Sequence, residues 1–285
     1  MKLGVISDCF KRPMAESIAL AGALGLEGIQ MYAVGGDICP DTLLGNEKKL
    51  GEYKELLKKH GLTVSALCGD LGGHGFERAE ENPVRIAKTK AIMDMALTFG
   101  TTVVTTHIGC VPHDETDPMY AVMQNALREL GEYGEKIGVS LAIETGPEPT
   151  AVLAKFLAPL PATVAVNYDP ANLVMVTGDD PVAGVANLAD RIVHTHVKDG
   201  LRLKESDARE VYGAFAEGGI ECEKLGEYFC ETPLGEGGVP MDAYFEALRV
   251  SGFDGFLTVE REVGESPYAD IKIAVDYLKA KLGRE

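Results

Sequence analysis

Eight short β-rich segments alternate with helical stretches along this chain, and this alternation constrains the fold more than any other feature. Segments 14–26, 82–100 and 119–138 have the apolar spacing and the closing glycines of amphipathic helices. Eight strand-helix repeats predict an α/β fold, a closed parallel (β/α)8 TIM barrel. The predicted strands are "KLGVIS" (2–7), "GIQMYA" (28–33), "TVSALC" (63–68), "TVVTTH" (102–107), "SLAIET" (140–145), "TVAVNYD" (163–169), "RIVHTHV" (191–197) and "FLTVE" (256–260).

A doubly wound open sheet is the alternative, but no G-x-G-x-x-G follows the first strand, which removes the best support for a dinucleotide fold. The length of 285 residues suits one barrel, and no linker interrupts it, so we expect a single domain over residues 1–285. Between Asp199 and Gly255 we predict no strand. Residues 201–233 are expected to form an extended loop with its own short helix over one end of the barrel.

The formal net charge of −17 argues against a nucleic-acid partner, which would need clustered Lys and Arg. A local basic residue can still hold one phosphate in an acidic protein. No apolar run is long enough for a membrane span and the first residues do not resemble a signal peptide, so we expect a cytoplasmic protein without a membrane partner. The 6 cysteines form no C-x-x-C pair, which favours reduced thiols over disulfides or a cysteine zinc site.

Ionisable side chains stand where five consecutive predicted strands end: His107, Glu144, Asp169, His196 and Glu260. The carboxyl ends of barrel strands all meet at one face, where the active sites of such barrels are built. We therefore expect these five side chains to converge near the barrel axis.

Three carboxylates held close together in a poorly solvated cavity repel each other unless a cation binds between them. Oxygen-rich ligation with one imidazole favours Mn²⁺, Mg²⁺ or Co²⁺, and Zn²⁺ is possible. The alternative is that each side chain bonds to a nearby loop. Counting back by twos places small or apolar residues, such as Ala142 under Glu144, below most of the charges, which predicts a mostly apolar interior.

Four motifs resemble, in order, those of the sugar isomerase and epimerase superfamily of xylose-isomerase-like barrels: "AIETG", "NYDPANL", "HTHVKDG" and "PLGEGGVPMDAYFEALRVSGFDGFLTVERE". This superfamily includes ketose 3-epimerases, inosose dehydratases and, more distantly, endonuclease IV repair enzymes. The resemblance covers the whole chain and implies that the metal ligands are Glu144, Asp169, His196 and Glu260. His194 lies one layer deeper, where core packing is weighed above a catalytic role.

The resemblance to the ketose 3-epimerases implies that Glu144 and Glu260 also exchange the substrate proton, one from each face, through a metal-stabilised enediolate. The chain departs from those enzymes at two positions: Asn172 stands where they have a histidine, and Thr150 where they have a glutamate. Their arginine six residues after the metal histidine is present as Arg202.

Four further residues are predicted to contact the substrate, a small sugar or sugar phosphate: His107, Asn172, Lys198 and Arg202. For Lys198 and Arg202 the alternative to a substrate or phosphate contact is a salt bridge to Asp199 or Glu262. His74, in a glycine-rich stretch after the third strand, is a candidate lid residue, although turn geometry explains those glycines equally well.

The leading interpretation is a metal-dependent sugar or sugar phosphate isomerase or epimerase. An inosose-type dehydratase would use the same enolising metal and is the closest alternative. An endonuclease IV-like phosphodiesterase would need more histidines and a less negative chain. A barrel that only binds a sugar would not need the four metal ligands. A homo-oligomer is possible.

Overall fold

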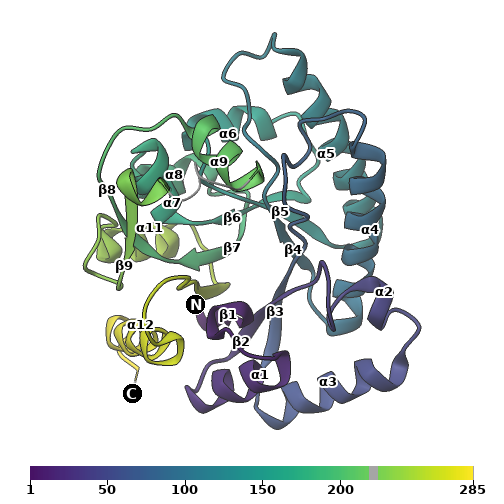
Figure 1. Ribbon diagram of the computed structural model, residues 1–285, viewed down its shortest axis with the longest axis vertical. Coiled ribbons are helices and arrows are strands. Elements are labelled where there is room, and N and C mark those ends of the chain that lie inside the picture. The colour runs from purple at the N-terminus through teal and green to yellow at the C-terminus, as the bar shows by residue number, and fades with distance from the viewer. Residues whose placement is uncertain (218–223, 285) are drawn as a thin grey trace.

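The computed structural model describes residues 1–217 and 224–284. Eight parallel strands close into a barrel in the order β1-β10-β7-β6-β5-β4-β3-β2, with helices around the outside (Figure 1). The predicted TIM barrel is therefore confirmed, and each barrel strand lies within a predicted segment. The barrel strands are β1 (Lys2–Ile6), β2 (Gly28–Tyr32), β3 (Thr63–Cys68), β4 (Val103–Thr106), β5 (Ser140–Glu144), β6 (Val164–Tyr168), β7 (Ile192–Val197) and β10 (Phe256–Val259).

Helices follow most of these strands and bury their apolar faces against the barrel. The predicted helices 82–100 and 119–138 correspond closely to α4 and α5, and the predicted helix 14–26 ends earlier, at Ala23. The helices are α1 (Met14–Ala23), α2 (Pro40–Leu43), α3 (Glu47–Lys59), α4 (Asn82–Phe99), α5 (Pro118–Ile137), α6 (Thr150–Leu157), α7 (Pro170–Asn172), α8 (Pro181–Leu188), α9 (Ala208–Glu217), α11 (Met241–Val250) and α12 (Pro267–Lys281), with short turns η1 (Ser7–Phe10), η2 (Leu173–Thr177) and η3 (Leu225–Glu227). None of the described helices is long and apolar enough to span a membrane.

The interval after β7 contains the helix that was predicted for it, α9, but the expectation that it holds no strand is wrong. Strands β8 (Asp199–Arg202) and β9 (Phe229–Thr232) pair antiparallel outside the barrel. The carboxylate of Asp199 stabilises this ribbon because it accepts backbone N–H groups from Gly200, Gly235, Gly237 and Val239. The ribbon and α9 lie beside the carboxyl ends of β6 and β7 (Figure 1).

The barrel interior below the predicted site is polar, so the expected mostly apolar interior is wrong. His194 is buried and bonds through Nδ1 to Asn167 Oδ1 at 2.9 Å and through Nε2 to Thr258 Oγ1 at 3.1 Å. Burial lowers the pKa of His194 well below its usual value, so the ring is neutral. The alternation of residues along single strands did not predict this polar layer, because its side chains come from different strands and satisfy one another's hydrogen bonds.

Candidate metal centre and active site

The four predicted metal ligands come together at the carboxyl ends of four adjacent strands. Glu144 ends β5 and His196 lies near the end of β7, while Asp169 and Glu260 directly follow β6 and β10. One ligand-type atom from each of the four lies within 4.8 Å of all the others, and all four residues are buried.

The two carboxylate oxygens of Asp169 have different surroundings. Its Oδ1 caps α7 by accepting the backbone N–H groups of Ala171 at 2.8 Å and Asn172 at 3.0 Å. Its Oδ2 is buried without a hydrogen-bond partner among the described residues. Burial raises the pKa of Asp169. A buried, unpartnered carboxylate oxygen facing two other carboxylates is costly unless a cation occupies the space between them.

The imidazole of His196 is oriented by a residue that the sequence analysis missed. Its Nε2 donates to Gln30 Oε1 at 3.0 Å, and Gln30 in turn donates through Nε2 to Thr105 Oγ1 at 3.1 Å. The other nitrogen, Nδ1, lies 3.5 Å from Glu144 Oε1 and 3.3 Å from Glu260 Oε2. With the Nε2 proton directed at Gln30 Oε1, the imidazole would bind a metal through Nδ1.

Glu260 is paired with a buried lysine. Lys198 Nζ donates to Glu260 Oε2 at 3.0 Å and to Glu262 Oε2 at 2.8 Å, so the predicted alternative of a salt bridge to Glu262 is present. Burial opposes the charged form of Glu260, but Lys198 and His196 outweigh burial and lower the pKa of Glu260 well below its usual value. Lys198 also lines the cavity described below.

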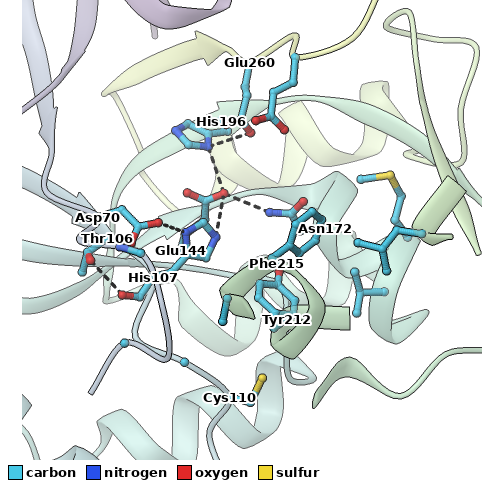
Figure 2. Close-up of a pocket in the computed structure, with 18 of the residues that line it drawn as sticks. Asp70, Thr106, His107, Cys110, Glu144, Asn172, His196, Tyr212, Phe215 and Glu260 are labelled. Atoms are coloured by element: carbon cyan, nitrogen blue, oxygen red, sulfur yellow. Dashed lines mark hydrogen bonds and ion pairs between the residues drawn. The ribbon is translucent and has the colours of Figure 1, made fainter. Parts of the chain in front are cut away.

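His107 stands beside the cluster and is held by Asp70, a second residue that the sequence analysis missed. Its Nδ1 lies 2.9 Å from Asp70 Oδ2, and its Nε2 lies 3.6 Å from Glu144 Oε1 (Figure 2). Burial lowers the pKa of His107, but the carboxylates of Glu144 and Asp70 outweigh burial and raise it to about 10. The carboxylate-imidazole pair is a typical arrangement for an acid/base group.

A cavity of about 870 Å³ opens above these side chains and is lined by Glu144, His196, Glu260, His107 and Lys198 among others. Of the other predicted residues, Asn172 lines it and donates to Glu144 Oε1 at 3.0 Å (Figure 2). His74 also lines it and lies between Glu77 and Glu217.

Arg202 is not among the lining residues. Its Nη1 donates to the carbonyl of Thr177 at 3.2 Å. The structure thus brings three of the four predicted substrate-contacting residues to the cavity and leaves Arg202 outside it.

Glu148 is a third residue that the sequence analysis missed. It is 2% exposed, its Oε2 accepts the backbone N–H of Val111 at 3.4 Å, and its Oε1 has no partner among the described residues. Burial raises its pKa to about 8, so it is held as a neutral acid near neutral pH. Its position four residues after Glu144, between two prolines, was the only available signal.

Three carboxylates and one imidazole form a donor set that fits a divalent cation. The unpartnered Oδ2 of Asp169 is the specific feature that such an ion would satisfy. The four buried residues would hold it, and the cavity leaves room for a substrate on the open side.

Known proteins resemble this chain in sequence and in fold. The family model "Xylose isomerase-like TIM barrel" matches residues 18–281. An inosose dehydratase from Lacticaseibacillus casei is 27% identical over 152 residues, which are 52% of this chain and 48% of that protein. The alignment thus spans about half the length of this curated relative.

Two solved structures share the fold over nearly the whole chain. The probable 3-DHS dehydratase AsbF from Bacillus anthracis has a TM-score of 0.76 and 20% identity, and covers 98% of this chain and 99% of its own. A D-tagatose 3-epimerase-like protein has a TM-score of 0.73 and 15% identity, and covers 99% of both chains. At these identities the likeness concerns the fold alone.

Proposed function

The chain belongs to the xylose isomerase-like TIM barrel family, and on that premise we propose that it is a divalent-metal-dependent lyase that removes water from a hydroxyketone of the inosose class. The observation that carries this proposal is the pair formed by Asp70 and His107 beside Glu144. An elimination needs a base for the proton next to the carbonyl and an acid for the departing hydroxyl. The carboxylates Glu144 and Glu260 alone would supply the base, but not a well-placed acid for the departing hydroxyl.

A divalent cation bound by Glu144, Asp169, His196 and Glu260 would polarise the substrate carbonyl and offset the charge of the enolate. Glu260 takes the proton from the carbon next to the carbonyl. His107 gives its Nε2 proton to the hydroxyl on the following carbon, so that the C–O bond breaks, a C=C bond forms and water leaves. Asp70 holds the imidazole and stabilises its charged form, and Asn172 orients Glu144.

An epimerase of a ketose or its phosphate, which the sequence analysis placed first, is the second candidate. It is favoured by Glu144 and Glu260, which both line the cavity and can exchange a proton at one carbon. The relative named inosose dehydratase supports the lyase, and the epimerase-like structure shows only that the fold also occurs in a protein with that name.

The test is a reaction of the metal-loaded protein with an inosose in heavy water, followed by NMR and mass spectrometry. Loss of the mass of one water supports the lyase. A product of unchanged covalent structure with deuterium next to the carbonyl identifies the epimerase instead. An absence of reaction with inososes, ketoses and their phosphates would exclude both candidates.

The variant His107→Asn separates the two steps of the proposed elimination. It should lower the rate of water loss by roughly 10²- to 10⁴-fold, while proton exchange next to the carbonyl continues. The exposed His113 provides a matched control, because His113→Asn changes the same side chain away from the cavity.

A further inference from the structure

The cavity has two chemically different sides. The inner side carries the carboxylates, His107, His196 and Lys198. The outer side is contributed largely by the segment between β8 and β9 and by η2. We call this side the apolar wall, and it consists of Tyr212, Phe215, Leu225, Phe229, Met175 and Val176, together with Val263, which also lines the cavity.

Of the residues that the structure describes, Arg209 of α9 and Glu231 of β9 are the charged side chains that this part of the chain adds to the cavity lining, and both are paired. Arg209 Nη2 lies 3.8 Å from Asp117 Oδ2, and Glu231 Oε1 accepts from Arg261 Nη1 at 2.6 Å. The wall therefore offers mainly aromatic, aliphatic and sulfur contacts.

Some apolar side chains that line the cavity are left uncovered by the protein. Phe215 is 55% exposed, Val263 is 48% exposed and Tyr32 is 37% exposed, although all three line the cavity. Large apolar side chains gathered around a concave site indicate that a ligand covers them.

The wall reaches the reacting groups through a row of rings. The His107 and Tyr212 ring centroids are 5.9 Å apart, and those of Tyr212 and Phe215 are 6.1 Å apart with the rings edge to face. Figure 2 places Tyr212 and Phe215 across Glu144 from Glu260. A substituent on the part of a substrate nearest His107 would thus extend along these rings.

The size of the cavity agrees with a larger ligand. Its volume of about 870 Å³ is near the upper end of the roughly 300–1,000 Å³ typical of pockets for drug-sized molecules. A six-carbon hydroxyketone alone would leave the apolar wall in contact with water.

We propose that the substrate is an uncharged hydroxyketone that carries an apolar, aromatic substituent, and that the apolar wall binds this substituent. The assignment of the hydroxyketone end rests on the proposed function, whereas the binding of the aromatic end rests on the wall alone. Aromatic rings pack favourably against Phe and Tyr edges and against Met sulfur.

The test compares two probes that differ only in the substituent, 4-nitrophenyl β-D-glucoside and methyl β-D-glucoside. Isothermal titration calorimetry with the full chain loaded with Mg²⁺ should show that the aryl compound binds about tenfold or more tightly. Phe215→Ser and, separately, Val263→Ser should reduce affinity for the aryl compound about three- to tenfold and leave that for the methyl compound unchanged. Both side chains are about half exposed, so we expect both variants to fold.

Ile273→Ser is the matched control, because Ile273 is 54% exposed on α12 and does not line the cavity. Equal binding of the two probes, no binding of the aryl probe, or an aryl preference that survives both cavity substitutions would overturn the proposal. Binding is read without turnover. A failure of the lyase assay with intact aryl preference would therefore refute the proposed function alone, and the reverse result would refute the apolar wall alone.

Discussion

The four clustered side chains differ in how much of their hydrogen-bonding capacity the protein already uses. Both oxygens of Glu144 accept bonds, from Asn172 Nδ2 at 3.0 Å and Asn167 Nδ2 at 3.3 Å. Asp169 has one oxygen bonded and one unpartnered, and His196 has one nitrogen bonded to Gln30. Asp169, whose Oδ2 is unpartnered, offers a ligand-type atom within 4.8 Å of one from each of the other three residues, which is the pattern expected of a site built for an ion.

Asp169→Asn should lower divalent metal affinity on the order of a hundredfold or more, because it removes a ligand charge while the amide oxygen can still cap α7. Metal content after dialysis, measured by mass spectrometry, reports the effect. Asp180 caps α8 through the same type of bonds to Val182 and Ala183, so Asp180→Asn is a matched control that should keep its metal. Equal metal content in both variants would contradict the assignment.

Gln30→Met should weaken metal binding by roughly 10- to 100-fold, because the Nε2–H of His196 loses its acceptor and the ring its orientation. Gln30→Glu retains an acceptor and should bind metal more tightly than Gln30→Met. Titration with a chromophoric chelator as competitor measures these affinities. If the two variants bind metal equally, the hydrogen bond to His196 has no positioning role.

At the scale of elements, the segment between β8 and β9 covers part of the cavity at the carboxyl end of the barrel. Its helix α9 places Tyr212 directly against the loop after β5. A Cβ on Gly146 would lie 2.0 Å from the Tyr212 hydroxyl, so only glycine permits this approach. The contact joins the cover of the cavity to the strand that carries Glu144.

Gly146→Ala should therefore displace Tyr212 and α9, raise KM several-fold and speed proteolytic cleavage near residues 203–217. Gly51→Ala is the control, because a Cβ at Gly51, within α3, meets nothing within 4 Å and Gly51 does not line the cavity. Limited proteolysis and steady-state kinetics test both variants. Identical cleavage rates for the two would show that the Gly146 contact does not hold α9.

At the scale of the whole molecule, the barrel buries several ionisable groups in a chain of net charge −17. Most are balanced by a partner, as Lys198 is by Glu260 and Glu262. Glu148 instead stays neutral, because burial raises its pKa from 4.5 to about 8. A buried acid of this kind makes stability depend on pH.

The raised pKa of Glu148 determines whether stability rises or falls with pH. Between pH 4.5 and about 8 the folded protein keeps a proton on Glu148 that the unfolded chain releases, so a rising pH favours unfolding. The stabilisation is complete below about pH 4.5 and lost as the pH passes 8, a change of up to a few kcal/mol. Glu148→Gln should flatten this part of the profile in urea unfolding from pH 5 to 9. An unchanged slope would contradict the burial of a neutral acid.

The order of strands and helices was predictable from the sequence alone, because side-chain periodicity is a local property of each segment. The convergence of the four candidate metal ligands was also predictable, because the carboxyl ends of parallel barrel strands share one face whatever the details of packing. Their positions on the predicted strands were enough to place Glu144 and His196 at this face.

Gln30 and Asp70 carry no local signal, because their roles depend on atoms far along the chain: Gln30 meets His196 across the barrel, and Asp70 meets His107 from another loop. Glu148 has only its position between two prolines, four residues after Glu144, as a signal. Arg202 follows the family pattern in sequence, yet its side chain is drawn to the carbonyl of Thr177. The antiparallel ribbon was likewise decided by long-range contacts, above all the backbone amides of Gly235, Gly237 and Val239 that donate to Asp199. Pairing between distant segments, and not residue type, determined these features, so only the tertiary structure specified them.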